Sequence, residues 1–380
     1  MKIDANSVTF EPQDMAFVKK FGILKATEMV LDYHAEHPNL PFLYDAEQLA
    51  GFLGISRGEL NDIVNHIQKE YKEAHLPKKD GTYRSLCVPS IRLRFCQDPI
   101  KEKILPQLPV SKFATAYQKG STTRGNAEPH IGKKFLLKLD ITDFFGSITF
   151  EQVQRTAFNT RYVSRQVGYL LTSLCCKDDS LPQGAATSPA LSNIVMYRFD
   201  DYIGRWCSQR QIAYTRYCDD MTFSANRPLY GVYQKVKTML REMGFELNES
   251  KTHFIGNDNR QSVTGLVVNE KLSIPSGYKR DLRQEVYYAL KFGVEDSVLH
   301  GHRSDFVEDG RPICCPTYML HLMGKVQYVL QIEPENLWFK DAQKKLLAYI
   351  YEHYSESLSY YLHFNKNGKG KGMYEQSNPV

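Results

Sequence analysis

The sequence predicts an α+β protein, in which a β-rich centre lies between helical ends. The first observation is a hairpin pattern at residues 213–224, where two β-rich runs flank a tight turn that contains adjacent aspartates. The second is an apolar, alternating run at residues 135–141, which is typical of a buried strand. The third is the helical spacing of apolar residues before residue 75 and after residue 278, which predicts helices on both sides of the strands.

Residues 1–75 are expected to form a helical extension, with helices near residues 14–36 and 45–73. Within it, residues 46–60 have the spacing of a helix-turn-helix. A DNA-reading helix carries Arg, Lys, Asn or Gln along one face, and here Arg57 and one Asn are opposed by an Asp. We therefore expect the extension to pack on the segment that follows it, and a DNA-binding regulator is the weaker alternative.

The run at residues 135–141 places Asp140 at its end, where a strand delivers its last side chains into a cleft. If this strand lies beside the 213–224 hairpin, Asp140 and Asp219 converge on one point. Polymerases and nucleases use such carboxylates to hold two metal ions roughly 3.5–4 Å apart. Mg²⁺ suits this arrangement because it binds few protein carboxylates and completes its shell with phosphates and water.

The acidic residues and the aromatic pair beside them also have ordinary explanations. Asp219 and Asp220 repel each other, which a solvated hairpin tip tolerates and a divalent cation turns into binding. Asp143 either caps a following helix or faces solvent. Phe144 and Phe145 are either core residues or, just past the metal-binding Asp, a ring that lies under a sugar.

Two further segments are able to approach a nucleotide. Gly184 and the small residues after it allow close backbone approach, and Ser188 as N-cap with Pro189 at the first position is expected to start a helix. Lys251 precedes an expected strand at residues 252–256, where it can reach a phosphate. Without a ligand, these features are a loop–helix boundary and an exposed lysine.

After the centre, helices are expected to begin at Tyr278 and to follow at residues 315–330 and 336–362. The first interleaves aromatic and basic residues, which fits an amphipathic helix with a solvated face or a helix that grips a nucleic-acid backbone. The Gly- and Lys-rich end at residues 365–372 is expected to be mobile.

Composition limits the classes of protein that remain. With 380 residues and 42% hydrophobic content, the chain can bury a large core in more than one domain. It shows no apolar run of about 18 residues and no basic and apolar leader, so neither a membrane helix nor a signal peptide is expected. Eight cysteines without paired Cys-x-x-Cys spacing favour reduced thiols in a cytoplasm. The net charge of +5 permits nucleic-acid binding without requiring it.

Four motifs stand in the order found in the palm of reverse transcriptases, which the chain resembles over residues 76–330. They are Leu-Asp-Ile-Thr-Asp-Phe-Phe at 139–145, Leu-Pro-Gln-Gly at 181–184, Tyr-Cys-Asp-Asp at 217–220 and Gly-Phe-Glu-Leu-Asn-Glu-Ser-Lys at 244–251. Residues 77–84, with Pro89, Gln97 and Ile100, resemble the family's fingers. The resemblance implies a right-hand polymerase fold with an N-terminal helical extension (1–75), fingers and an antiparallel palm sheet with helices (76–270), a helical thumb (271–364) and a basic tail (365–380).

Two shorter elements narrow the resemblance to bacterial retron reverse transcriptases. Asn126–His130 resembles their Asn-Ala-x-x-His element, and Val263–Gly265 resembles their Val-Thr-Gly element, which contacts the cognate RNA in that family. Each is weak alone, because the second is also an ordinary strand with a glycine and His130 can be a structural histidine. Together they favour a retron enzyme over an intron-encoded or diversity-generating one.

The resemblance assigns the site residues in three groups. The catalytic and metal-binding residues are Asp140, Asp219 and Asp220, with Ile141 as a further ligand of two Mg²⁺ ions that Mn²⁺ can replace. The nucleotide-binding residues are Lys79 and Arg84 over the triphosphate, Phe145 at the sugar's 2′ position, and Asp143, Phe144, Gln183 and Lys251. The RNA-binding residues are Asn126, His130, Val263, Thr264, Gly265, Lys279, Arg280 and Arg283. Ala186, where proline is common, and Cys218, where alanine or methionine is common, depart from the pattern without removing a ligand.

As a retron enzyme, the protein is expected to be a cytoplasmic RNA-directed DNA polymerase that uses deoxynucleoside triphosphates. The resemblance implies that it copies part of a cognate noncoding RNA, primed from an RNA 2′-hydroxyl, and keeps the branched RNA–DNA product. It also implies a neighbouring effector protein, a role in phage defence and a possible higher-order assembly. The alternatives are another reverse transcriptase class, such as an intron-derived enzyme, and a non-catalytic RNA-binding assembly protein. The intact Asp140, Asp219 and Asp220 oppose the second.

Overall fold

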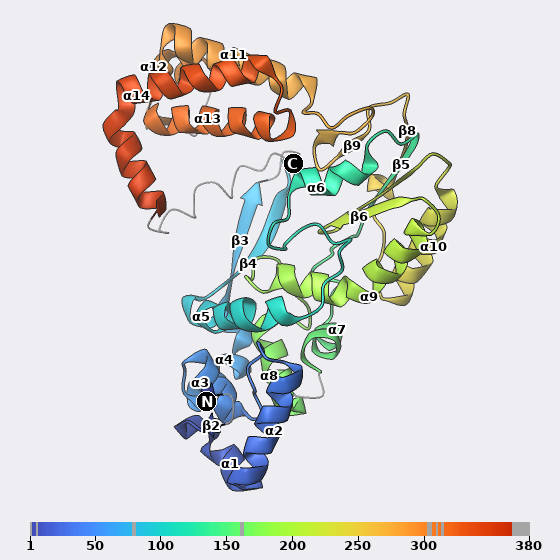
Figure 1. Cartoon of the computed structure of the whole chain (residues 1–380), viewed down its shortest axis with the longest axis vertical. Coiled ribbons are helices and arrows are strands. Elements are labelled where there is room, and N and C mark those ends of the chain that lie inside the picture. The colour runs from blue at the N-terminus through green and yellow to red at the C-terminus, as the bar shows by residue number, and fades with distance from the viewer. Residues whose placement is uncertain are drawn as a thin grey trace. The chain divides into compact units, whose positions relative to one another are not determined.

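The computed structural model describes residues 2–4, 7–77, 81–159, 163–301, 306–308, 311–312 and 315–366 (Figure 1). The chain packs into two compact units. The first unit comprises Met1–Ser121 and Leu137–Phe254, and the second comprises Thr122–Leu136 and Ile255–Val380. This division cuts across the predicted segments, because residues 122–136 leave the centre of the chain and pack with its C-terminal part. Lys79 and residues 367–380 of the predicted tail lie outside the described residues.

The first unit combines a helical N-terminal part with a sheet backed by helices. Its strands are β1 (Lys2–Asp4), β2 (Ser7–Thr9), β3 (Tyr71–Pro77), β4 (Tyr83–Pro89), β5 (Phe135–Asp140), β6 (Ala213–Tyr217), β7 (Asp220–Ala225) and, at its end, β8 (His253–Gly256). Its α-helices are α1 (Met15–Phe21), α2 (Ile23–Glu36), α3 (Ala46–Leu53), α4 (Arg57–Asn65), α5 (Ile91–Pro99), α7 (Phe150–Val153), α8 (Arg165–Cys175), α9 (Ser188–Ser208) and α10 (Tyr230–Glu242).

The helix-turn-helix predicted within the helical stretch at residues 45–73 is present as α3 and α4, but the stretch ends earlier than expected. Gly54 takes a left-handed backbone, φ +74°, and ends α3, a conformation that glycine adopts without steric cost. Ser56 then caps α4 through a reciprocal bond with Glu59, and the chain becomes extended from Tyr71. The local turn residues therefore divide the helical pattern in two.

The N-terminal helices α3 and α4 share one hydrophobic core with the segment that follows them. Leu49, Leu60 and Ile63 are fully buried in the same cluster as Leu93 and Cys96 of α5. Arg92 of α5 adds an ion pair to Asp62 of α4, with 2.7 Å between the charged groups. The expected packing of the N-terminal extension on the next segment is confirmed. Asp62, the acidic residue that argued against a DNA-binding helix, forms part of this contact.

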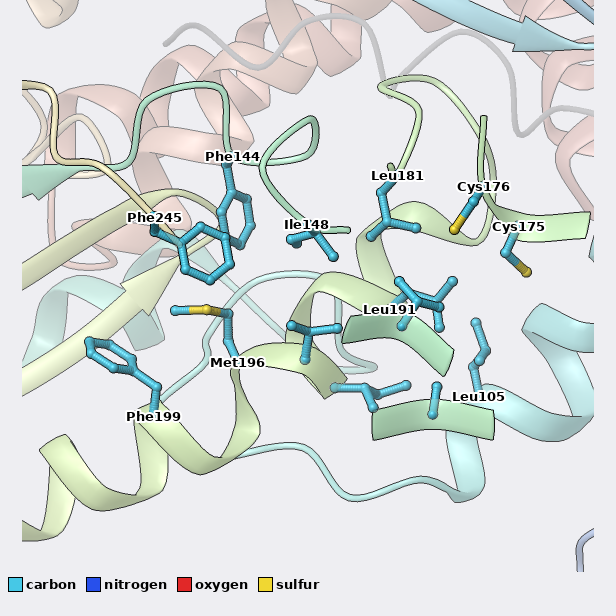
Figure 2. Packing of buried hydrophobic residues seen from close by; sticks show 14 of the residues in the cluster. Leu105, Phe144, Ile148, Cys175, Cys176, Leu181, Leu191, Met196, Phe199 and Phe245 are labelled. Atoms are coloured by element: carbon cyan, nitrogen blue, oxygen red, sulfur yellow. The ribbon is translucent and has the colours of Figure 1, made fainter. Parts of the chain in front are cut away.

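A four-stranded sheet in the order β6-β7-β5-β8 forms the centre of the first unit. β6 and β7 are an antiparallel hairpin in which Tyr214 lies opposite Phe223, and their rings stack with 4.6 Å between centroids. Buried side chains of α9, among them Met196 and Phe199, pack beneath the sheet with Phe245 (Figure 2). This apolar floor gives the strand ends a rigid base.

β3 and β4 form a separate two-stranded antiparallel ribbon, with Tyr71 opposite Pro89 and Pro77 opposite Tyr83. Most of its side chains towards the turn are exposed. A ribbon that buries so little apolar surface is only marginally stable by itself, so its position depends on contacts made near its base.

The second unit is mainly helical. Its helices are α6 (Thr123–Ala127), α11 (Ser276–Phe292), α12 (Val294–His300), α13 (Cys315–Ile332) and α14 (Leu337–Lys366), and its strands are β9 (Ser262–Val263), β10 (Leu266–Val267), β11 (Val307–Glu308) and β12 (Arg311–Pro312). Helices α11, α13 and α14 lie side by side around a core that includes Leu282, Leu322 and Phe339 (Figure 1). The three predicted C-terminal helices are confirmed. No helix within the described residues is both long and apolar enough to cross a lipid bilayer.

Candidate active site

The acidic turn joins β6 to β7 through the two residues Cys218 and Asp219, since Tyr217 pairs with Asp220 across the hairpin. Cys218 has φ +62° and is the only one of the two with positive φ, which is the pattern of a type II′ turn. Glycine normally occupies that position, so a cysteine there holds backbone strain that the surrounding structure must maintain. The turn is therefore fixed rather than a loosely solvated tip.

Asp140 reaches the same place from β5. This strand lies next to β7 in the sheet, which confirms the predicted neighbourhood of the two segments. The backbone N–H of Ile141 donates to the carbonyl oxygen of Asp219 at 3.3 Å. The end of β5 is thereby bonded directly to the acidic turn, and the carboxylates at 140, 219 and 220 share one region.

Electrostatics at this point favour a cation. Burial raises the pKa of Asp140, and the Asp219 charge adds to that increase, while a hydrogen bond from Lys251 opposes it. Burial also raises the pKa of Asp220, with further increases from Asp219 and Asp140 and a decrease from Lys138. Asp140 and Asp220, whose pKa values are raised beside the Asp219 charge, gain from a divalent ion, which neutralises them.

Lys251 supplies part of that neutralisation. Its Nζ lies 3.1 and 3.0 Å from the two carboxylate oxygens of Asp140. The lysine is the last residue of a short 3-10 helix, Glu249–Lys251, which is capped by the Asn248 side chain. Burial by itself lowers the pKa of Lys251, but its bond to Asp140 and the charges of Asp219 and Asp220 outweigh that effect and raise it. The predicted lysine thus lies at the acidic cluster.

The donor set fits a metal that takes few protein ligands. Within the described residues, no group of three or more His, Cys, Asp or Glu side chains is arranged to hold a metal ion by itself. Mg²⁺ does not need such a cage, since substrate phosphates and water supply its other ligands. Ile141 fits a backbone role, because the bonds from Thr142 to Glu246 and from Asn248 to Asp140 flank it. In this antiparallel pattern, the Ile141 carbonyl oxygen points away from the 246–248 segment and forms no backbone hydrogen bond with it.

The residues after Asp140 separate into core and exposed positions. Asp143 is exposed with φ +41°, and Thr149 rather than Asp143 caps the following helix. Phe144 is only 4% exposed and packs against Phe245. Phe145 is partly buried, with its ring centroid 5.5 Å from that of Phe144. Of the two aromatic residues, Phe145 is the one that keeps an accessible surface.

The Leu-Pro-Gln-Gly loop packs against the base of the β3–β4 ribbon. Cys87 of β4 donates its N–H to the carbonyl of Gln183 at 2.7 Å. Gly184 has φ +125°, and a Cβ there would lie 2.8 Å from the Cys87 carbonyl oxygen. The predicted close approach at Gly184 is therefore to a strand of the protein. Gln183 keeps partial exposure beside this contact, and Arg84 is exposed further along β4.

Helix α9 starts one residue away from the predicted cap. Thr187 is the N-cap residue, so Ser188 is the first residue of the helix and Pro189 the second. The Ser188 hydroxyl donates to the Pro182 carbonyl at 2.7 Å instead of bonding the helix N-terminus. The predicted cap was wrong because the loop offered this serine another partner.

Comparison with known proteins decides which family this site belongs to. The family model described as reverse transcriptase (RNA-dependent DNA polymerase) matches residues 76–268. The chain is 28% identical to the retron Ec86 reverse transcriptase of Escherichia coli over 270 residues, which are 70% of this chain and 84% of that protein. It is 31% identical to the retron Mx65 reverse transcriptase of Myxococcus xanthus over 320 residues, 78% of this chain and 70% of that protein. This chain belongs to the retron-type reverse transcriptases.

A third relative, the retron Ec83 reverse transcriptase of Escherichia coli, is 34% identical over 233 residues, which are 57% of this chain and 75% of that protein. This retron-type reverse transcriptase is accordingly an RNA-directed DNA polymerase with the right-hand polymerase fold. It requires divalent metal, an RNA template and deoxynucleoside triphosphates.

In the second unit of the reverse transcriptase, the two short retron-like elements meet. β9 and β10 form a hairpin whose two-residue turn is Thr264 and Gly265, with φ +44° and +80°. The Thr264 hydroxyl donates to the Thr123 carbonyl at 3.2 Å, and the Asn126 side-chain amide donates to that hydroxyl at 3.4 Å. Segments 138 residues apart thus form one structure.

The other predicted RNA-binding residues of this region differ in exposure. Val263 and His130 are fully buried, and Asn126 is 2% exposed. Burial, helped by the charge of Lys133, lowers the pKa of His130 to about 3. These three side chains are therefore buried, and that of Asn126 donates a hydrogen bond to the Thr264–Gly265 turn.

The three basic residues of α11 are also unequal. Lys279 forms an ion pair with Glu333, with 2.6 Å between the charged atoms, and both side chains are largely buried. The Arg283 guanidinium lies over the Trp338 ring at 5.6 Å. Arg280 has a side chain that is 80% exposed. Arg280 is therefore the most exposed of the three, and its Nε lies 3.3 Å from the exposed Asp281 carboxylate.

Sequence reasoning missed the residues behind the acidic turn. Asp200 and Asn193 of α9 and Arg216 of β6 are buried and bonded to one another. Tyr117, with φ +60°, donates its hydroxyl to the Cys218 sulfur at 3.0 Å. An Arg within a strand pattern normally indicates an exposed position, so the sequence offered no signal that its partner lies on another element.

Proposed function

We propose that this enzyme copies part of a cognate structured noncoding RNA into DNA, starting from an RNA 2′-hydroxyl and yielding branched RNA–DNA. The observation that carries the proposal is the bonded contact between Asn126 and Thr264. This contact supports an RNA-recognition element at the β9–β10 turn. In it, the buried Asn126 holds Thr264 in its left-handed conformation. The similarity to the retron reverse transcriptases of Escherichia coli and Myxococcus xanthus agrees with this proposal.

For the chemistry, we propose a two-ion Mg²⁺ site held by Asp140 and Asp219, with Asp220 and the Ile141 carbonyl in support. When bound, the ions activate the attacking hydroxyl and neutralise the triphosphate. Lys251 forms an ion pair with Asp140. If a cation were held by that carboxylate, the Lys251 ammonium would be available to bond a phosphate oxygen.

The nucleotide pocket in this proposal is built from both the sheet and the ribbon. Arg84 and Lys79 close over the triphosphate, Gln183 lines the pocket and Phe145 bounds the sugar at its 2′ position. The bond between Cys87 and Gln183 supports this assignment, because it ties the strand that carries Arg84 to the loop. Positioning of this kind supplies most of the catalysis in phosphoryl transfer.

The broader context is proposed from the relatives. The enzyme would work in the cytoplasm, retain its RNA–DNA product and act in phage defence with an effector protein encoded nearby, in a higher-order assembly where one forms. The division into fingers and palm (76–270), thumb (271–364), extension (1–75) and tail (365–380) belongs to the same proposal. An intron-derived or other defence enzyme remains the alternative class.

The metal assignment is tested by Asp219→Asn combined with Asp220→Asn. We expect the double variant to lose Mg²⁺-dependent DNA synthesis on a primed RNA template while it binds RNA as before, because the proposed RNA contacts lie in the second unit. Extension assays and filter binding measure the two properties. Undiminished synthesis by the folded variant would remove these residues from the site.

The retron class is tested by isolating the protein from cells that carry its native locus and sequencing the nucleic acid bound to it. We expect a covalently branched RNA–DNA species. After alkaline hydrolysis of the RNA, the branching ribonucleotide should stay attached to the DNA through its 2′-oxygen. Linear DNA copies of cellular RNA, without a branch, would favour another class of reverse transcriptase.

A further inference from the structure

Behind the acidic turn, the buried Arg216 side chain is hydrogen-bonded to two other buried side chains, those of Asp200 and Asn193. The Arg216 Nε lies 2.9 Å from Asp200 Oδ1, and its Nη2 lies 2.6 Å from Asp200 Oδ2, which is a two-pronged ion pair. Nη2 also donates to the Asn193 side-chain oxygen at 3.1 Å. Arg216 and Asp200 both have no exposed side-chain surface. We call Arg216, Asp200 and Asn193 the buried triad.

The fork of Arg216 has one more donor, and it points at the turn. Nη1 donates to the carbonyl oxygen of Cys218 at 2.8 Å. On the other side of Asp219, its own carbonyl accepts the N–H of Ile141 at 3.3 Å. The peptide groups before and after the Asp219 α-carbon are therefore both anchored, and they fix the direction in which its carboxylate leaves the backbone.

The same triad reaches the segment that borders β6. The Asn193 amide donates to the carbonyl of Ala116 at 2.8 Å. Arg216 exchanges two backbone bonds of 2.8 Å with that segment, from its N–H to Phe113 and from Thr115 to its carbonyl. Tyr117, next in the chain, contacts Cys218. The turn is held from both directions by one network.

A buried ion pair is not explained by stability alone, because the desolvation free energy of the two charges usually exceeds the free energy of their attraction. The charge balance here is also specific. A lone arginine behind a divalent-cation site would repel the cation, whereas Asp200 neutralises Arg216 at contact distance. The arrangement keeps a rigid, five-donor side chain under the turn without adding net charge.

We propose that Arg216, Asp200 and Asn193 are positioning residues that preset the Asp219 carboxylate for divalent metal. The proposal rests on the proposed metal site at Asp140 and Asp219. The triad touches neither substrate nor metal, and it acts through the Cys218 carbonyl. Loss of the triad therefore lowers turnover and weakens metal binding while leaving the binding of template unchanged.

The main test replaces the charges by apolar groups, so that no buried ion is left unpaired. Asp200→Leu, Tyr214→Phe and Arg216→Met are combined, since the Tyr214 hydroxyl also donates to Asp200 at 2.7 Å. We expect roughly a 10- to 100-fold loss of kcat, as misplacement of a reacting group produces. The Mg²⁺ concentration for half-maximal rate should rise about tenfold, with unchanged affinity for a primed RNA template.

A second variant covers the case in which the triple variant does not fold. Arg216→Lys keeps the charge opposite Asp200 but lacks the fork, so it cannot serve Asp200 and the Cys218 carbonyl together. It should shift the Mg²⁺ dependence in the same direction. Wild-type kcat and Mg²⁺ dependence in folded Arg216→Lys, or in the folded triple variant, would overturn the proposal.

The control is Tyr33→Phe, which removes the hydrogen bond that the buried Tyr33 hydroxyl donates to the Pro41 carbonyl at 3.0 Å in the N-terminal helical part of the same unit. Its melting temperature should fall without a change in Mg²⁺ dependence. The Asp219→Asn, Asp220→Asn enzyme is assayed beside these variants. If it loses synthesis while the triad variants do not, the positioning role fails and the metal site stands; if it keeps synthesis, the metal site itself fails.

Discussion

Cys218 and Thr264 hold left-handed backbone at the two turns where function is expected, with φ +62° and +44°. Such positions cost roughly 1–3 kcal/mol for residues other than glycine and persist only where neighbours enforce them. Arg216 and Tyr117 bond to Cys218, and Thr123 and Asn126 bond to Thr264. At both turns, a buried side chain, Arg216 in the first and Asn126 in the second, therefore helps to maintain the left-handed conformation.

Phe145 is predicted to decide which sugar the enzyme accepts. Phe145→Ala should raise incorporation of ribonucleotides relative to deoxynucleotides by about 10-fold or more, because the ring no longer fills the space of a 2′-hydroxyl. Phe145→Tyr keeps the bulk and should keep the discrimination. Single-nucleotide extension with matched triphosphates measures the ratio, and the same ratio in Phe145→Ala and wild type would exclude Phe145 as the gate.

His130 is predicted to make stability depend on pH. Its pKa is about 3 in the folded protein and 6.5 as a free side chain, so the unfolded chain binds the extra proton between these values. Stability should therefore be complete above pH 6.5 and decrease as the pH falls towards 3, with a loss of about 2 kcal/mol by pH 5.

His130→Gln, which does not titrate, isolates this contribution. Denaturant unfolding of both proteins at pH 7.5 and pH 5 should show the wild type losing more stability than the variant. Equal losses in the two proteins would mean that His130 is protonated in the folded state at pH 5.

At the scale of elements, the β3–β4 ribbon depends on the loop before α9. The bond from Cys87 to Gln183 and the tight approach of Gly184 lie at the base of the ribbon, on the strand that carries Arg84. No side chain fits at Gly184, since its Cβ would meet the Cys87 backbone. The motif residue that suggested contact with a nucleotide is instead explained by packing between two elements.

Gly184→Ala should push the loop away from β4. The combined backbone strain and overlap should destabilise the protein by roughly 1–3 kcal/mol, and the KM for deoxynucleotides should rise as the ribbon loses its support. Gly231→Ala, in α10 with open space around it, should be neutral or slightly stabilising. Thermal melts and steady-state kinetics of both variants distinguish the two positions, and an unchanged KM in Gly184→Ala would show that the ribbon is held elsewhere.

For the whole molecule, chemistry and template choice are expected to reside in different units. The carboxylates belong to the first unit, whereas Asn126, Thr264 and the helix carrying Arg280 belong to the second. Variants in the second unit should thus alter which RNA is used more than how fast a bound template is copied.

Thr264→Ala tests this separation. Removal of the hydroxyl breaks its bonds to Thr123 and Asn126, so use of the cognate RNA should fall about tenfold, the equivalent of 1.4 kcal/mol. Copying of a generic primed template should be nearly unchanged. Thr264→Ser keeps the hydroxyl and should behave like wild type in both assays. A similar loss on both RNAs would make Thr264 a structural residue.

The sequence alone predicted most of the element types and, through the order of its motifs, the reverse transcriptase family. Asp140 and the Asp219–Asp220 turn follow from period-two alternation that ends in acids, and the C-terminal helices follow from helical spacing, because both signals are local. The end of the 45–73 helical stretch and the cap at Ser188 were wrong, since the chain becomes extended at Tyr71 and the Pro182 carbonyl accepts the Ser188 hydroxyl.

Only the tertiary structure showed that Arg216 is buried, that Asp200 neutralises it and that Gly184 packs on Cys87. It also showed that Asn126 and Thr264 meet across 138 residues. The burial and partners of a polar side chain depend on elements distant in the chain, and no local pattern encodes them. The acidic turn could therefore be found by its sequence, but what holds it in place could not.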